Sequence, residues 1–140
     1  MTSIIFIRIL IKQQHIIIRI KTKQINMNNR KITNPFDIEL KPFDRYGSII
    51  DKMSWHLVSF DKDTSFGSYI LKLEPGAHSI PHKHTGFEEF IVLKGELVDS
   101  DNTVFKKGDF VTFEPGSVHS SHTKNGCLLL VFQMGVNKPI

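Results

Sequence analysis

From residue 50 onward, short apolar stretches alternate with polar turns along the chain. The apolar runs are five to eight residues long and cover 55–60, 66–73, 89–93, 109–113 and 128–132. The turns between them carry glycine, proline, asparagine or aspartate, as in Glu74-Pro75-Gly76, Glu114-Pro115-Gly116 and Lys124-Asn125-Gly126. Turns at such regular spacing, without apolar residues at helical intervals, are typical of an all-β sandwich or barrel. We therefore expect an all-β fold, with Lys94-Gly95 ending the strand at 89–93.

The chain before this pattern falls into two parts. Residues 1–26 hold ten isoleucines and five basic side chains but no acid, and the basic residues interrupt the apolar runs. A secretory signal needs an unbroken apolar region, so we expect an N-terminal extension without function, and Met27 is a candidate for the true start. A targeting peptide, or an element packed on the domain, is the alternative. Residues 27–50 contain Asn34-Pro35 and Lys41-Pro42 and predict an extended arm before a barrel at 51–140.

Composition narrows the class of protein. The 140 residues suffice for one domain, and no run reaches the roughly 18 apolar residues of a membrane-spanning helix, so we expect no membrane partner. The net charge of +4 comes from residues 1–26, because residues 27–140 hold 13 basic and 14 acidic side chains. We therefore expect no nucleic-acid partner. A single cysteine, Cys127, excludes an internal disulfide and fits a reducing compartment, the cytoplasm.

Candidate metal ligands gather in one part of the sequence. His82 and His84 are two residues apart, so in a strand both rings project from the same face. Glu88 follows a turn at 85–87 that can bring its carboxylate beside them, and His119 comes just after the turn at 114–116. Two histidines and a carboxylate hold first-row divalent metals while leaving coordination positions open. The pattern predicts a metal site with a third histidine added.

These residues resemble the cupin superfamily. Gly76, His82, His84, Glu88 and Gly95 stand at the spacing of its first motif. The second motif is matched by Gly108, Gly116 and His119, and it departs from the family at Glu114 and Thr123 without loss of a ligand. Within the superfamily the chain is similar to the ChrR-like cupin domains and their stand-alone relatives, through Trp55, Leu73-Glu74-Pro75-Gly76-Ala77, Glu88-Glu89, Pro115-Gly116-Ser117 and Gly126-Cys127.

The resemblance implies a single-domain jelly-roll barrel, the double-stranded β-helix of cupins, which functions as a homodimer. It implies that His82, His84, Glu88 and His119 bind a divalent ion inside the barrel, with Fe, Zn, Mn and Ni all open. The expected function is a metal-dependent enzyme of dioxygenase, isomerase or lyase type acting on a small chelating organic molecule. The alternatives are a ChrR-like zinc sensor or ligand-binding module without turnover, and a storage or structural cupin. The first 50 residues hold no cysteine, so sigma-factor binding by a zinc-binding domain does not carry over.

Other residues near these motifs are assigned individually. Tyr69 shares its strand face with Leu71 and Leu73, and we expect it to point inward. Its phenol is the candidate catalytic group, as a hydrogen-bond donor to substrate or as a base, and a capped core tyrosine is the alternative. We expect His78 and Glu89 at the surface, His122 on the opposite face from His119, and Cys127 packed as a small apolar side chain.

Overall fold

The computed structural model describes residues 29–140, of which residues 33–140 form one compact unit. The expectations for residues 1–26 and Met27 lie outside the described residues. No helix long and apolar enough to cross a membrane occurs in the described part of the chain. Its strands are β1 (Lys41–Pro42), β2 (Met53–Leu57), β3 (Phe66–Leu73), β4 (His82–His84), β5 (Glu88–Asp99), β6 (Val104–Lys106), β7 (Phe110–Phe113), β8 (Val118–His119), β9 (Ser121–His122), β10 (Cys127–Met134) and β11 (Asn137–Pro139).

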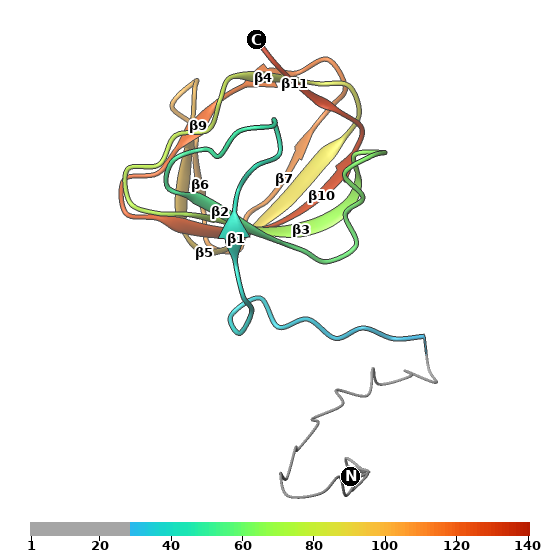
Figure 1. Cartoon of the computed structure of the whole chain (residues 1–140). Coiled ribbons are helices and arrows are strands. Elements are labelled where there is room, and N and C mark those ends of the chain that lie inside the picture. The colour runs from blue at the N-terminus through green and yellow to red at the C-terminus, as the bar shows by residue number, and fades with distance from the viewer. Residues whose placement is uncertain (1–28) are drawn as a thin grey trace, which may run out of the picture. The chain divides into compact units, whose positions relative to one another are not determined.

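The strands of residues 33–140 form two sheets that enclose a barrel interior. The larger sheet runs β1-β2-β3-β10-β5-β6, with β7 and β9 also paired to β5, and the smaller sheet runs β11-β4-β8. In Figure 1 the large sheet curves, so that β4 and β11 lie across the barrel from β3 and β10. The all-β barrel expected from the sequence is therefore confirmed.

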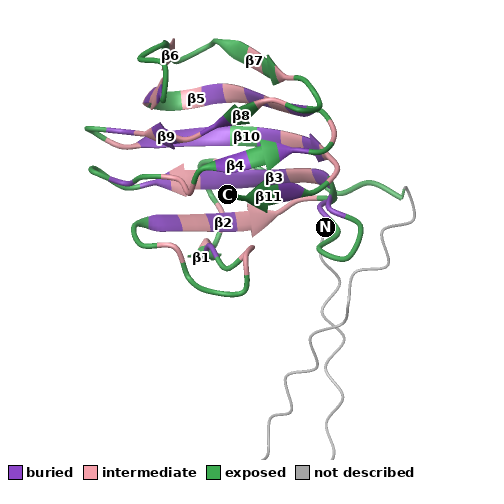
Figure 2. Ribbon diagram, turned by 90° about the horizontal axis from the view of Figure 1, so that it is seen from above, coloured by how far each residue is buried: buried purple, intermediate pink, exposed green. Residues whose placement is uncertain are grey.

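Alternating side chains of the central strands fill the interior. In β3, Tyr69, Leu71 and Leu73 are all buried, and Leu71 and Tyr69 lie opposite Leu129 and Val131 of β10. Figure 2 shows buried and half-buried residues alternating along β5. A strand places successive side chains on opposite faces, so the apolar set fixes which face is interior. Tyr69 thus points inward as expected.

Strand β5 differs from the prediction. It does not end at Lys94-Gly95 but continues to Asp99, giving a strand of 12 residues. The register against β10 shifts between Leu128 and Leu129, and Gly95 takes a φ of +76° at this irregularity. An extra residue absorbed as a β-bulge lets the ladder continue beyond it. The glycine that predicted a turn therefore sits within a strand, and the longer strand carries Asp99 into the barrel interior.

The segment between β1 and β2 folds back over the barrel, and we call residues 43–50 the cap loop. The amide of Ile50 donates to the carbonyl of Phe43 at 2.9 Å, which closes the loop. Phe43 is buried against Trp55, with ring centroids 4.8 Å apart and nearly perpendicular planes. In Figures 1 and 2 the loop lies at one end of the barrel. Part of the predicted arm thus contributes to the core.

Candidate metal centre

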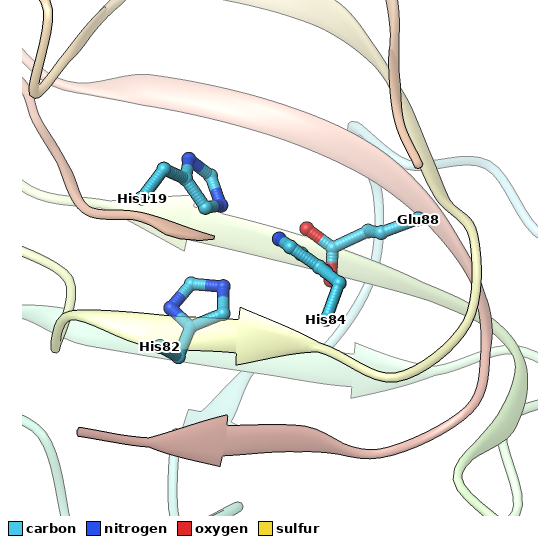
Figure 3. Close-up of side chains that lie close together, drawn as sticks. All are labelled: His82, His84, Glu88 and His119. Carbon is cyan, nitrogen blue, oxygen red and sulfur yellow. The ribbon is translucent and has the colours of Figure 1, made fainter. Parts of the chain in front are cut away.

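Four side chains converge inside the barrel, and we call His82, His84, Glu88 and His119 the histidine–glutamate cluster. One ligand atom of each lies within 4.8 Å of the others, and all four residues are buried (Figure 3). His82 and His84 come from β4, Glu88 begins β5, and His119 ends β8. The structure therefore brings together the four residues that the sequence singled out.

Strand pairing and a tight reversal position these side chains. His82 lies opposite His119 in the β4–β8 ladder, and Lys83 between the two β4 histidines is exposed. The chain then reverses at residues 85–87, where a Cβ on Gly86 would lie 1.5 Å from the carbonyl oxygen of Met134. Only glycine allows this close approach of two backbones. The reversal places Glu88 beside His84, with the His84 Nδ1 atom 3.9 Å from the carboxylate.

Groups behind the cluster fix the orientation of its members. The Nδ1 atom of His82 lies 2.7 Å from the carbonyl oxygen of Ile80, and the Nδ1 atom of His119 lies 3.1 Å from the Asp99 carboxylate. Both partners are acceptors, so each Nδ1 carries the proton and each Nε2 carries a lone pair. Asn137 donates from Nδ2 to Glu88 Oε2 at 2.6 Å.

Four ring nitrogens of the cluster make no hydrogen bond to the described part of the protein. Among residues 29–140, Nε2 of His82, both ring nitrogens of His84 and Nε2 of His119 are buried without a hydrogen bond. A buried polar atom without a partner is costly, and several such atoms around one point call for a shared ligand. Lone-pair nitrogens and a carboxylate are the donors that Fe, Mn, Ni and Zn accept in proteins. The residues present therefore fit a divalent ion.

Burial keeps the rings in the form that binds metal. Desolvation lowers the pKa of His84 to about 4 and also lowers the pKa of His82, against a smaller opposing effect of the Glu88 charge on His84. A histidine must be neutral to coordinate a cation. Both rings are thus ready for coordination at neutral pH without prior loss of a proton.

The cluster borders a largely apolar cavity within the barrel, which we call the inner cavity. His82, Glu88 and His119 form part of its wall, and the centres of water-sized molecules have about 60 Å³ available. A single water needs about 10–15 Å³ by this measure, so the cavity holds several waters or a small organic molecule. The other lining residues are Phe43, Tyr46, Ile50, Met53, Tyr69, Leu71, Leu73, Ser79, Ile80, Phe90, Leu97, Ser121, Leu129, Val131 and Asn137.

Tyr69 contributes its side chain to this wall. Its hydroxyl donates to Gln133 Oε1 at 3.2 Å and accepts from Arg45 Nη1 at 3.3 Å. Burial, together with the charge of Glu88, raises the pKa of Tyr69 well above its usual value of 10. The phenol therefore keeps its proton in the metal-free protein, where its O–H is donated to Gln133.

The other residues singled out in the sequence lie outside the cluster. His78 and His122 stack on each other on neighbouring segments, with ring centroids 5.4 Å apart, and His78 is exposed. Glu89 accepts a hydrogen bond from Thr112 at 3.4 Å. Cys127 is buried in the core, and desolvation raises the pKa of its thiol to about 12, which makes it unreactive.

Asp99, Asn137 and Arg45 were missed by sequence reasoning. Asp99 stands in a run of turn residues, Ser100-Asp101-Asn102, that gave no reason to single it out. Asn137 and Arg45 lie far along the chain from the residues they contact, and no local motif marks either one. Only the closed barrel brings them to the site.

Comparison with known proteins identifies the family. The sequence model of the ChrR cupin-like domain matches residues 38–137. No curated protein matches the chain.

Solved structures of similar fold share little sequence with this chain. An acetylacetone dioxygenase from Acinetobacter johnsonii has a TM-score of 0.63 and 18% identity, covering 80% of this chain and 82% of that one. A cupin-like protein of unknown function from Ralstonia eutropha has a TM-score of 0.58 and 16% identity, covering 63% of each chain. The complex of SigE with the anti-sigma ChrR from Rhodobacter sphaeroides has a TM-score of 0.55 and 17% identity, covering 70% of this chain and 49% of that one. This chain thus spans less than two thirds of the Ralstonia protein and about half of the chain in the ChrR complex. At these identities the likeness concerns the fold, and the family follows from the sequence match: the chain belongs to the ChrR cupin-like domain family.

Proposed function

We propose that this protein binds one divalent ion through His82, His84, Glu88 and His119 and is an enzyme acting on a small organic molecule in the inner cavity. The observation that carries the proposal is the set of buried, unpartnered ring nitrogens at the edge of an apolar cavity. Four ligands on a six-coordinate ion leave two positions open, which suits a chelating substrate. When bound, such an ion supplies Lewis-acid or dioxygen-activating chemistry.

The chain's own residues would select and orient the substrate. The apolar wall of the inner cavity favours a molecule with an apolar body, which would displace the water there. We propose Tyr69 as the catalytic residue: it retains its proton, and an oxygen of the substrate would replace Gln133 Oε1 as the acceptor of its O–H. Asn137 holds the Glu88 carboxylate in place through its Nδ2 atom.

The reaction belongs, in this proposal, to the dioxygenase, isomerase or lyase classes. The fold is similar to that of an acetylacetone dioxygenase, which supports testing β-diketones first, followed by hydroxy acids and phenols. Iron, manganese, nickel and zinc all accept this donor set, so the identity of the ion is an experimental question.

Anaerobic purification followed by elemental analysis tests the metal site. We expect one ion per chain, and His84→Ala should lower metal affinity by roughly tenfold or more, since removing even a group behind a ligand costs that much. His78→Ala is the matched control, because His78 is exposed and outside the cluster. Equal metal affinity in both variants would reject the ligand assignment. An oxygen-consumption screen of the loaded protein then tests turnover.

A second candidate function is a zinc-binding sensor module, favoured by the family match over residues 38–137. A sensor would hold zinc in a closed tetrahedral site and show no turnover. X-ray absorption spectroscopy of the purified protein separates the two. A six-coordinate ion with exchangeable water supports the enzyme, and a four-coordinate zinc without open positions supports the sensor.

A further inference from the structure

Arg45, at the centre of the cap loop, is held against the barrel by aromatic and polar side chains. Its guanidinium carbon lies 5.0 Å from the centroid of the Phe60 ring. Its Nη1 atom donates to Gln133 Oε1 and to the Tyr69 hydroxyl. These contacts fix the guanidinium in one place, next to the hydroxyl that we assign to the substrate.

The same guanidinium has no anionic partner among residues 29–140. Its Nη2 atom is buried and makes no hydrogen bond. The neighbouring carboxylates are engaged elsewhere, because Asp44 pairs with Lys62 at 2.9 Å and Glu88 accepts from Asn137 at 2.6 Å. Arginine stays charged at any physiological pH, so a buried donor of this kind is expensive unless an anion meets it.

A second cavity is lined in part by the Arg45 side chain, and we call it the outer cavity. In this cavity the centres of water-sized molecules have about 320 Å³ available. Its lining residues are Arg45, Tyr46, Phe60, Lys62, Ser65, Val136, Asn137, Lys138 and Pro139. Three of these side chains are cationic, and no acidic side chain of the described residues lines it. The outer cavity is therefore electropositive.

The two cavities share part of their walls. Tyr46 and Asn137 line both, and Asn137 also binds the Glu88 carboxylate. Tyr46 and Asn137 therefore stand between Arg45 and the histidine–glutamate cluster.

We propose that Arg45 binds the carboxylate of a small organic acid whose apolar body extends past Tyr46 into the inner cavity. The inference rests on the proposed function, since the far end of the acid would lie at the metal site. A guanidinium recognises a carboxylate by charge-assisted hydrogen bonds that a neutral group cannot replace. Among the substrates named under the proposed function, this inference therefore favours the organic acids over the neutral diketones.

Isothermal titration of the full chain with phenylacetate and phenylacetamide tests this proposal. The two probes have nearly the same shape and differ in charge. We expect the wild type to bind the acid roughly tenfold or more tightly than the amide, because a hydrogen bond to a buried charged group is worth that ratio. Arg45→Gln should abolish the preference, and Arg45→Lys should retain part of it. Lys62→Gln removes a different cation from the wall of the outer cavity, one already paired with Asp44, and should retain most of the preference.

Equal binding of the two probes by the wild type overturns the proposal. So does a preference that survives in Arg45→Gln, or one that Lys62→Gln removes to the same extent, which would point to diffuse electrostatics. If Arg45→Gln fails to fold, the wild-type comparison and Arg45→Lys still decide. Metal content is measured on the same samples: one ion per chain without a preference for the acid overturns this inference alone, whereas absence of bound metal overturns the proposed function.

Discussion

Replacing Asp99 by asparagine should weaken metal binding although Asp99 is not itself a proposed ligand. The Asp99 carboxylate accepts a hydrogen bond from His119 Nδ1 at 3.1 Å, and both side chains are buried. The negative charge holds the ring in the tautomer that leaves Nε2 free for the ion and increases the basicity of that nitrogen. Asparagine has nearly the same shape and keeps an acceptor oxygen, but it removes the charge.

The expected size of the effect follows from this difference. Changes to groups behind a metal-bound histidine typically lower affinity by about 10–100-fold. In the wild type the Asp99 carboxylate also accepts a hydrogen bond from the Ser100 amide at 2.8 Å. Asparagine can still accept the hydrogen bonds of both His119 Nδ1 and this amide, so we expect the lower end of that range. This is about tenfold in Kd, or about 1.4 kcal/mol.

A zinc competition titration against a chromophoric chelator measures this loss. Asp101→Asn is the matched control, because Asp101 is exposed two residues away and its contact at 2.9 Å is with the amide of Thr103. Thermal unfolding of the metal-free variants checks that both retain the fold. Zinc affinity of Asp99→Asn within twofold of the wild type would refute the reasoning that Asp99 orients His119 for metal.

Three further predictions concern pH, the reversal at 85–87 and the phenol. Below pH 6.5 the unfolded chain protonates His84, whereas the folded ring does so only near its lowered pKa of about 4. In urea unfolding of the metal-free protein, His84 should therefore contribute about 2 kcal/mol less stability at pH 5 than at pH 7, and His84→Ala should remove this part of the pH dependence. By the same assay, Gly86→Ala should lower the free energy of unfolding by about 3 kcal/mol. Gly108→Ala, whose Cβ would meet nothing within 4 Å, should lower it by only about 1 kcal/mol. Similar losses in the two variants would contradict the clash at Gly86. The Tyr69→Phe variant should still bind metal but should lose roughly tenfold in kcat/KM. Unchanged kinetics would mean that the Tyr69 side chain serves only in packing.

The proximity of His82, His84 and Glu88 could be predicted from the sequence because their geometry is local. His82 and His84 share a strand face by the two-residue period, and the glycine at position 86 allows the reversal that brings Glu88 near them. The bulge in β5 could not be predicted in the same way. Whether Gly95 ends a strand or remains inside one depends on its neighbour across the ladder, where a Cβ on Gly95 would lie 2.1 Å from the Gly126 carbonyl oxygen. That contact exists only after β5 and β10 have paired.

The groups behind the ligands could not be predicted because tertiary structure alone brings them to the site. Asp99 acts on a histidine 20 residues away, and Asn137 acts on a glutamate 49 residues away. Arg45 reaches Gln133 across 88 residues. No spacing rule connects such positions, and polar residues of these types are common in loops.

The dependence of the site on distant groups links metal binding to closure of the barrel. The ring of His82 is oriented by Ile80, that of His119 by Asp99 of β5, and the carboxylate of Glu88 by Asn137 of β11, so the ligand set is complete only when both sheets have met. An ion that binds this set binds the folded chain and not the unfolded one. At a free concentration 100 times its Kd, such an ion stabilises the fold by about 2.7 kcal/mol. Such an ion would also offset the cost of the unpartnered ring nitrogens, so metal binding, as proposed, and closure of the barrel would stabilise each other.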